Sequence, residues 1–377
     1  MINEVKAKFA NLFEHAPDGV WSAPGRVNLI GEHTDYNNGF VFPFGIDRRT
    51  WVALSLRNDR IARVGSTFSN EVFEYELSEN KPADLAWALY PLGVAWAMSE
   101  RAGKGFDAFF VSDVPVGAGL SSSAAIECSI ATALNDVWQS GYTRQELALI
   151  GQKAENQVVG APTGIMDQTA SMLAKADCAV LIDCQSLATE LVELGLSQKE
   201  LVVAVIDTRV AHRHSDGGYR VRREACEKGA AIMSVNSLRD LTAEDLSRAS
   251  ELMDELTFRR CRHVITENQR VLDAVNALKS GNLESMGDLM LQSHASMRDD
   301  FEISIPELDL AVETAMSAGA IGSRMTGGGF GGAAIAIINQ SKLGELRSQC
   351  LEAFSNQGFI EPNVFSVTPS DGARRDY

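Results

Sequence analysis

The chain has 377 residues, of which 45% are hydrophobic and 22% are charged, a composition typical of folded globular proteins. Its 34 basic and 50 acidic residues give a formal net charge of −16, which disfavours nucleic acid and anionic membranes as partners because like charges repel. The length exceeds what one hydrophobic core usually supports, so we expect two domains.

The first residues predict an amphipathic helix rather than a signal peptide, because Val5, Phe9 and Phe13 fall at helical spacing. No segment approaches the ~20 apolar residues that a membrane helix needs. The chain has six cysteines without a CxxC pair, which argues against a zinc ribbon or a secreted disulfide scaffold. We therefore expect a cytoplasmic protein.

Strands and helices are predicted in mixed order, which indicates an α+β or mixed α/β fold. Apolar and β-branched runs predict strands at Val20–Ser22, Thr50–Leu56, Phe106–Val114, Ala179–Asp183, Leu201–Asp207 and Ala333–Ile338. Apolar positions three and four apart predict helices over 144–159, 219–234, 252–278, 283–298 and 306–318. The stretch Asp183–Lys199 is the expected crossing between the two halves.

The segment VPVGAGLSSSAAIECSIATAL, from Val114 to Leu134, predicts a strand, a glycine-rich turn and the start of a helix. Helix N-termini bind phosphate because their first N–H groups lack partners and the macrodipole is positive there. A serine N-cap on a buried helix is the simpler alternative. Two spaced glycines and three serines favour phosphate binding, with a serine hydroxyl available to Mg²⁺.

Three better-known nucleotide motifs do not match this segment. A Walker A loop needs Gly-Lys-Ser/Thr, and a dinucleotide fingerprint needs glycine where Ser122 stands. The HRD, DFG and VAIK elements of protein kinases are also missing from the sequence. A nucleotide bound here would belong to a different kinase fold.

A second glycine-rich segment contains five glycines among the six residues 327–332, interrupted only by Phe330. A flexible hairpin would also use glycine. Five glycines in this spacing favour close approach of the backbone to a ligand or another loop. Polar residues also gather in Ala23–Phe40 and in Gly160–Met172. Taken singly, most acidic residues in a chain with 50 of them are better explained as helix caps or solvated surface charges.

Taken together, these stretches resemble the galactokinase family, within the superfamily of galactokinase, homoserine kinase, mevalonate kinase and phosphomevalonate kinase. GRVNLIGEHTDYNNGFVFP is similar to the galactokinase signature, VGAGLSSSAA to the ATP loop, and RMTGGGFGG to the third motif. AENQVVGAPTGIMDQ and SHASMRDDFEIS are similar to further galactokinase segments. The resemblance implies a two-domain α+β architecture with the active site in the interdomain cleft. An N-terminal domain, 1–185, would carry the sugar signature and ATP loop, and a C-terminal domain, 186–377, the third motif.

The resemblance implies ATP-dependent phosphorylation of α-D-galactose at the C1 hydroxyl. Asp167 and Arg26 match the family residues that lie against this hydroxyl. An ionised aspartate can accept the hydroxyl proton, and the arginine can hold the carboxylate and stabilise charge on the transferred phosphoryl group.

The resemblance also implies the binding residues. The sugar contacts match Glu32, His33, Thr34, Asp35 and Tyr219. The ATP loop matches Gly117, Ala118, Gly119, Leu120, Ser121, Ser122 and Ser123, and the Mg²⁺ ligands match Ser123 and Glu155. Relatives that phosphorylate N-acetylgalactosamine tend to carry isoleucine where this chain has Thr34, which favours galactose. The expected partners are these small molecules, with the chain acting as a monomer.

Several alternatives stay open at this point. A kinase for N-acetylgalactosamine or L-arabinose would share most of these motifs. A non-catalytic sugar and ATP sensor would also share them, although such relatives tend to alter the serines that this chain retains. His212, His214 and Asp216 alternate in a pattern that is one route to a metal site, but a solvated loop near the sugar is the preferred interpretation.

Overall fold

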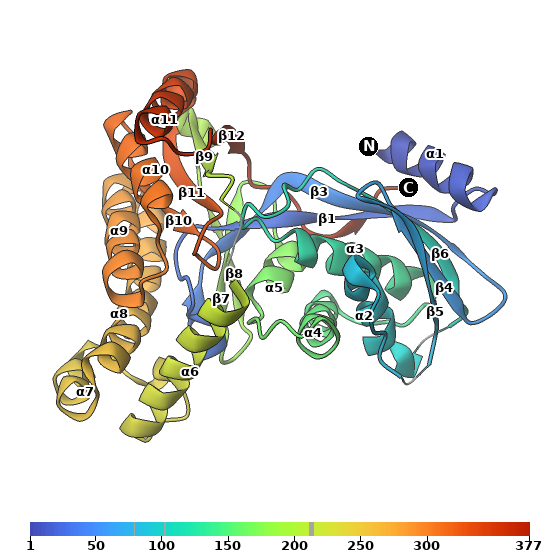
Figure 1. The fold of residues 1–377 in the computed structure, drawn as a ribbon, viewed down its shortest axis with the longest axis horizontal. Coiled ribbons are helices and arrows are strands. Elements are labelled where there is room, and N and C mark those ends of the chain that lie inside the picture. Colours follow the sequence, from blue (N-terminus) through green and yellow to red (C-terminus); the bar gives the residue numbers. More distant parts are fainter. Residues whose placement is uncertain (79, 102, 211–214) are drawn as a thin grey trace.

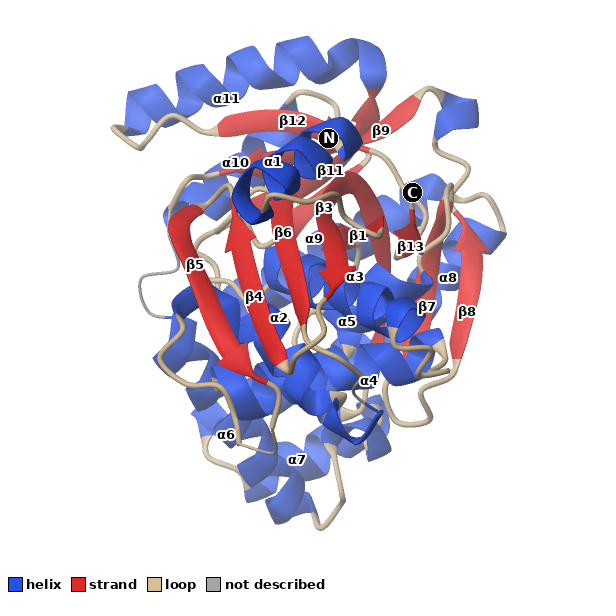
Figure 2. Cartoon of the chain, turned by 90° about the vertical axis from the view of Figure 1, so that its right-hand side faces the viewer, coloured by secondary structure: helices blue, strands red, loops and turns tan. Residues whose placement is uncertain are grey.

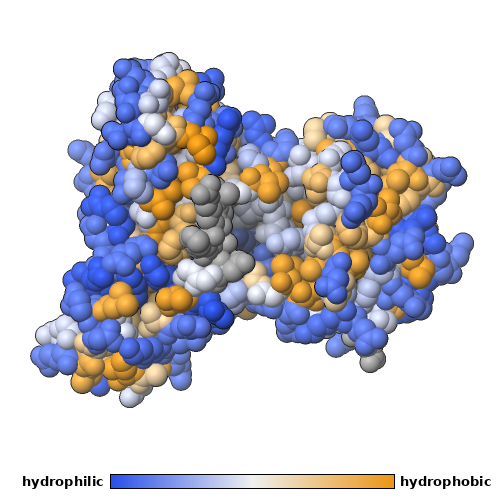
Figure 3. All heavy atoms as spheres, viewed as in Figure 1, coloured by the Kyte–Doolittle hydropathy of each residue, from blue (hydrophilic) through white to orange (hydrophobic). Residues whose placement is uncertain are grey.

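The computed structural model describes residues 1–78, 80–101, 103–210 and 215–377. They form two lobes, with the first half of the chain in one and most of the second half in the other (Figure 1). The surface is hollowed between the lobes (Figure 3). Within the described residues, no helix is both long and apolar enough to cross a bilayer.

A six-stranded mixed sheet forms the first lobe, in the order β13-β1-β3-β6-β4-β5. Neighbouring strands are antiparallel except for β4 and β6, which are parallel. The strands are β1 (Gly19–Asn28), β3 (Pro43–Leu56), β4 (Ile61–Ser66), β5 (Ser69–Glu76), β6 (Phe106–Ser112) and β13 (Arg374–Arg375).

Both faces of this sheet are covered, because successive residues of a strand point to opposite faces and the central strands carry apolar residues on each. Helix α1 (Ile2–Phe13) packs on one face, where Val20 of β1 and Trp51 of β3 contribute to a small core (Figure 2). The opposite face carries Trp21 and Val52 in a larger core. Helices α3 and α5 lie on that face with α2 and α4 beyond them, with bounds α2 (Leu89–Ala97), α3 (Ser122–Val137), α4 (Arg144–Ala154) and α5 (Met166–Leu173).

The second lobe is built on an antiparallel four-stranded sheet in the order β10-β11-β9-β12. Its strands are β9 (Leu201–Asp207), β10 (Gly322–Thr326), β11 (Ala333–Asn339) and β12 (Asn363–Val367). Its helices are α6 (Ser215–Met233), α7 (Leu246–Leu252), α8 (Glu255–Lys279), α9 (Leu283–Ser296), α10 (Pro306–Ser317) and α11 (Leu343–Gln357). A core of apolar residues from both lobes, including Val27 and Val205, joins this sheet to the first lobe.

A third, small sheet and the C-terminal segment complete the fold. The sheet contains β2 (Phe40–Val41), β7 (Cys178–Asp183) and β8 (Thr189–Glu193), in that order. After β12 the chain returns to the first lobe, where Arg374 and Arg375 pair with Ser22 and Trp21 of β1. The division of the chain between residues 185 and 186 stays a prediction.

The six strands and five helices predicted from apolar patterns are all present, and so are the predicted N-terminal helix, as α1, and the helix after the glycine-rich turn, as α3. Most ends are shifted, whereas β9 has the predicted bounds. Helix α8 begins at Glu255, three residues later than predicted, because the Asp254 side chain caps it by accepting a hydrogen bond from the Thr257 amide. The predicted crossing at Asp183–Lys199 contains strand β8, which pairs with β7 before the chain enters the second lobe.

Candidate active site

The glycine-rich turn after β6 brings the start of α3 to the cleft. Gly117 and Gly119 adopt φ angles of +80° and +71°, in the left-handed region that favours glycine. Ser121 precedes the helix and makes no side-chain cap, so the simple N-cap alternative is not what the structure contains. The hydroxyl of Ser121 instead donates a hydrogen bond to Asp167. The first amides of α3 have no intrahelical acceptors and remain available to an anion.

A β-bulge in strand β1 directs the Arg26 side chain towards the glycine-rich turn. Its register with β3 shifts between Pro24 and Arg26, and such bulges redirect the side chains beside them. Gly25 passes so close to the ATP loop that a Cβ there would lie 2.5 Å from the carbonyl oxygen of Leu120. The Arg26 amide donates to that carbonyl at 3.0 Å. Strand and loop are therefore locked together beside the arginine.

Arg26 joins the ATP loop to the predicted catalytic carboxylate. Its Nε and Nη2 donate to the two carboxylate oxygens of Asp167 at 2.8 and 3.0 Å, a bidentate pair. Its Nη1 donates to the carbonyl oxygen of Gly119 at 2.6 Å. Asp167 lies in the first turn of α5, where the helix dipole also favours a negative charge. Three segments far apart in the sequence thus meet at one guanidinium.

Nearly all the predicted site residues line one cavity of about 340 Å³ between the lobes. Its walls include Arg26, Glu32, His33, Asp35, Gly117, Gly119, Leu120, Ser121, Ser122, Ser123, Glu155, Asp167 and Tyr219, with Gly327, Gly328 and Gly329 of the third motif. Two predicted residues, Thr34 and Ala118, are fully buried and do not line it.

Asp35 and Tyr219 face the cavity from opposite lobes. Burial, and secondly the charge of Asp167, raises the pKa of Asp35 to about 7. Gly164 packs directly against this carboxylate, since a Cβ there would lie 2.0 Å from Oδ2. Burial likewise holds the pKa of the Tyr219 phenol well above its usual value, so this group is a neutral donor and acceptor.

His33 and Thr34 already have protein partners for their polar atoms. Burial lowers the pKa of His33 to about 3, so its ring is neutral at pH 7. A neutral ring with Nε2 donating to the Gly328 carbonyl at 3.2 Å and Nδ1 accepting from the Tyr36 hydroxyl at 2.8 Å satisfies both nitrogens. The Thr34 hydroxyl lies 2.6 Å from the Phe40 carbonyl oxygen. The polar atoms of both side chains are thus held by the protein, and the sugar contacts expected of them from the sequence stay a prediction.

The surroundings of Glu155 fit a divalent cation. Its carboxylate accepts hydrogen bonds from Thr163 and Gln168, both at 2.8 Å, and the same Gln168 amide donates to the buried Glu127 at 2.9 Å. Burial, and next the charge of Asp167, raises the pKa of Glu155, while burial and Glu155 raise that of Glu127. This local excess of acidic groups is what a bound cation would offset.

Within the described residues, no three His, Cys, Asp or Glu side chains form a metal cage. Mg²⁺ does not require one, because it takes few protein ligands and keeps waters and phosphate oxygens. The histidines at 212 and 214 and the side chain of Asp216 lie outside the described part of the structure, so the alternative metal site there stays untested.

Comparison with known proteins decides the family. Residues 7–56 match the galactokinase galactose-binding signature, and residues 89–175 and 274–356 match the N-terminal and C-terminal domains of GHMP kinases. Galactokinase of Streptomyces coelicolor is 46% identical, covering 98% of this chain and 97% of that protein. The chain belongs to the galactokinase family. Galactokinase of Streptomyces lividans is 44% identical over 93% of this chain and 89% of its own length.

Solved structures agree with this membership. The structure of Lactococcus lactis galactokinase complexed with galactose has a TM-score of 0.95 at 31% identity, covering 99% of both chains. Mevalonate kinase of Methanococcus jannaschii shares the fold, with a TM-score of 0.69 at 18% identity over 93% of this chain and 98% of its own. The two-domain GHMP kinase fold predicted from the sequence motifs is confirmed, and so is the galactokinase family.

Proposed function

We propose that this chain transfers the γ-phosphoryl group of ATP to the C1 hydroxyl of α-D-galactose, giving α-D-galactose 1-phosphate and ADP. One observation carries the proposal. The Arg26–Asp167 pair lies in the same cavity as the amides that open α3 and the polar residues of the galactose-binding signature. Such a cavity can hold a phosphate chain and a polyhydroxylated acceptor side by side.

Asp167 is the group that accepts the proton of the attacking hydroxyl. Both of its carboxylate oxygens already accept hydrogen bonds, from Arg26 and Ser121. A carboxylate has about four lone-pair sites, so one remains available for the sugar hydroxyl. The bonds to Arg26 and Ser121 fix the direction from which this hydroxyl is received, which matters because phosphoryl transfer depends mainly on positioning and electrostatics.

Arg26 and the amides of α3 supply positive charge on the side of the phosphates. The guanidinium keeps Asp167 in place through two nitrogens and holds the Gly119 carbonyl with the third. Its positive charge also lies beside the position where negative charge develops on the transferred group. The net charge of −16 therefore does not prevent ATP binding, because the local field is set by these groups.

Glu32, Asp35 and Tyr219 supply the directional contacts to the sugar. All three line the cavity, and together they offer two acids and a phenol to its hydroxyl groups. Hydrogen bonds to a charged acceptor are stronger than neutral ones, so the two acids are the principal contacts when they are ionised. The similar galactokinase of Lactococcus lactis was solved in complex with galactose, which supports this sugar as the acceptor.

The metal of this reaction is Mg²⁺, held by the Ser123 hydroxyl and the Glu155 carboxylate. When bound there it neutralises phosphate charge and orients the phosphate chain. We also propose that the enzyme is cytoplasmic, since all six cysteines are free and buried. We propose that the enzyme acts as a monomer, since one chain supplies every residue of the cavity. We also propose that its two domains divide between residues 185 and 186.

The test is an ADP-release assay with galactose, glucose, L-arabinose and N-acetylgalactosamine, each with and without Mg²⁺. We expect galactose to give the highest kcat/KM and activity to depend on the metal. Equal or higher kcat/KM with N-acetylgalactosamine or L-arabinose would assign the enzyme to that sugar instead. Binding of galactose without release of ADP would favour a sensor.

A further inference from the structure

Glu32 of the sugar signature contacts residues of the second lobe, and the sequence did not predict these contacts. Its side chain is only 3% exposed, although it carries a carboxylate. One oxygen, Oε1, accepts a hydrogen bond from the Gly327 amide at 2.7 Å and another from the Thr326 hydroxyl at 3.1 Å. Arg324 lies on the same side, with Nη1 3.6 Å from Oε1. Within the described residues, no hydrogen bond engages Oε2.

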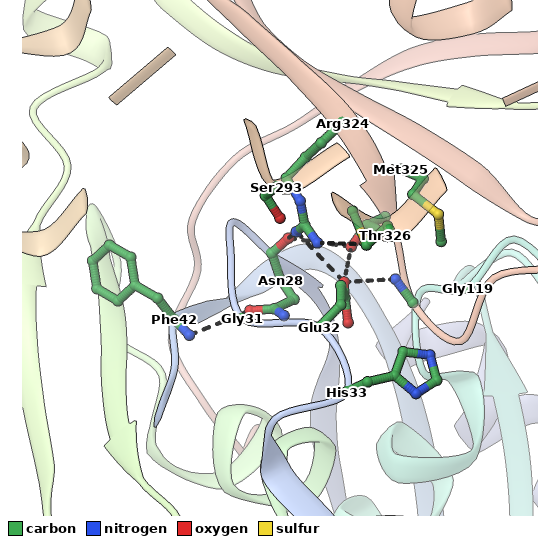
Figure 4. Close-up of polar contacts among 12 residues, drawn as sticks. Asn28, Gly31, Glu32, His33, Phe42, Gly119, Ser293, Arg324, Met325 and Thr326 are labelled. Atoms are coloured by element: carbon green, nitrogen blue, oxygen red, sulfur yellow. Dashed lines mark hydrogen bonds and ion pairs between the residues drawn. The ribbon is translucent and has the colours of Figure 1, made fainter. Parts of the chain in front are cut away.

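The two oxygens of Glu32 thus point to different surroundings. Figure 4 shows Oε1 directed at Arg324 and Thr326, and the second oxygen directed away from both. Glu32 also lines the cavity of the site. An oxygen of a buried carboxylate that has no protein donor needs one from a ligand or water, because burying a charged group without a partner is costly.

The donors to Oε1 come from strand β10 and the loop after it, and contacts with β1 and the ATP loop hold these two segments in place. Arg324 is fully buried, and its Nη1 donates to the Asn28 carbonyl of β1 at 3.0 Å. The Thr326 hydroxyl lies 3.2 Å from the same carbonyl oxygen. Gly327 packs against the ATP loop, where an added Cβ would be 3.2 Å from the Gly119 carbonyl oxygen. Residues of the second lobe therefore contact both Glu32 and the ATP loop beside Arg26.

We propose that Thr326 and Arg324 are positioning residues for the sugar: by holding Oε1 they aim Oε2 of Glu32 at one hydroxyl of the acceptor. The inference rests on the proposed function, in which Glu32 contacts the sugar. It extends the sugar-recognition site from the signature in the first lobe to strand β10 of the second. Without the Thr326 hydroxyl, Oε1 would keep the Gly327 amide and the more distant Arg324. The carboxylate would then rotate more freely and would meet the sugar hydroxyl less often in the correct orientation.

Thr326→Val is the decisive variant, because valine has nearly the same shape as threonine but lacks the hydroxyl. We expect the Kd for galactose to rise roughly three- to tenfold, as for the loss of one hydrogen bond. Thr326→Ser restores the hydroxyl and should restore the wild-type Kd. Thr50→Val is the matched control: Thr50 is also fully buried and loses a hydroxyl contact, with Ser112 at 2.9 Å, yet lies away from the cavity.

Single-deoxy galactoses provide a readout that a merely structural role would not change. In the wild type, removing the hydroxyl that meets Oε2 should weaken binding by about tenfold or more, because the carboxylate oxygen is left unpaired. In Thr326→Val we expect that penalty to shrink at least about threefold for this one sugar and to stay unchanged for the other deoxy sugars. The KM for ATP should remain near the wild-type value.

Three results would overturn the inference. The first is an unchanged galactose Kd in Thr326→Val, and the second is an equal rise in KM for galactose and ATP. The third is the same deoxy-sugar pattern in Thr326→Val and wild type. Glu32→Gln separates these from failure of the proposed function: if it binds galactose as tightly as wild type, the sugar contact itself is wrong. Weaker binding in Glu32→Gln with an unaffected Thr326→Val rejects the positioning role alone.

Discussion

Gly164 is the position where one methyl group should disturb the sugar site most directly. A Cβ there would lie 2.0 Å from Oδ2 of Asp35 and 2.2 Å from its Cγ. Ordinary van der Waals contact requires roughly 3.4 Å or more, so in Gly164→Ala the carboxylate must retreat by about 1.4 Å or the segment carrying residue 164 must move. A hydrogen bond stretched by that distance is lost, because donor and acceptor then lie about 4 Å apart.

A hydrogen bond to a charged group contributes about 1.5–3 kcal/mol, so the galactose Kd should rise roughly 10- to 150-fold in Gly164→Ala. Calorimetric titration with galactose measures this directly, and the ADP-release assay reports KM and kcat. If the segment moves instead, Asp167 three residues later moves with it, and kcat falls. Gly344→Ala, in helix α11 with open space around the added methyl, is the control that should change neither value. Wild-type Kd and kcat in Gly164→Ala would refute the tight contact with Asp35.

Asp167→Asn should lower kcat by about 10² or more while the fold is retained, since the proton acceptor is lost; near-normal turnover in the ADP-release assay would remove it from that role. Ser123→Ala should raise the Mg²⁺ concentration needed for half-maximal activity, and an unchanged Mg²⁺ titration would exclude Ser123 as a ligand. Burial and the charge of Asp167 raise the pKa of Asp35 to about 7, and the ionised form accepts the stronger hydrogen bonds. The galactose Kd should therefore fall by up to about tenfold per unit as pH rises towards 7 and level off above it, whereas a flat profile, as expected for Asp35→Asn, would contradict this assignment.

The elements that the sequence predicted are those with strong local patterns. Strands β9 and β11 are runs of apolar residues, and both lie at the centre of a sheet. Strand β10 was missed, although every residue in it is buried, because its five residues GSRMT are mostly small or polar. Its burial comes from neighbours that are distant in the sequence, which local periodicity does not report.

Within the candidate site, motif resemblance identified most of the residues that line the cavity but not the residues that hold them in place. Arg324 is fully buried in a chain where charged residues are expected at the surface. Glu127 lies on α3 after the ATP loop, and nothing in the neighbouring sequence distinguishes it from other polar helix residues. Its hydrogen-bond partner, Gln168, lies 41 positions later in the chain. Such contacts depend on how the helices pack, so no signal in the local sequence identifies them.

Some contacts beside the active site can form only late in protein synthesis, because the C-terminal segment returns to the first lobe. The amides of Gly372 and Ala373 donate to the carbonyls of Ala174 and Ser171, at 2.7 and 2.8 Å, at the end of helix α5. The next two residues form β13 against β1. The strand that carries Arg26 and the helix that carries Asp167 contact each other directly, since the Ser171 hydroxyl donates to the Pro24 carbonyl at 2.7 Å. The C-terminal residues add a second connection between them, and they are synthesised about 200 positions after Asp167. A nascent chain arrested before residue 372 would lack the bonds from Gly372 and Ala373 to the end of α5, although it could already form the Arg26–Asp167 pair.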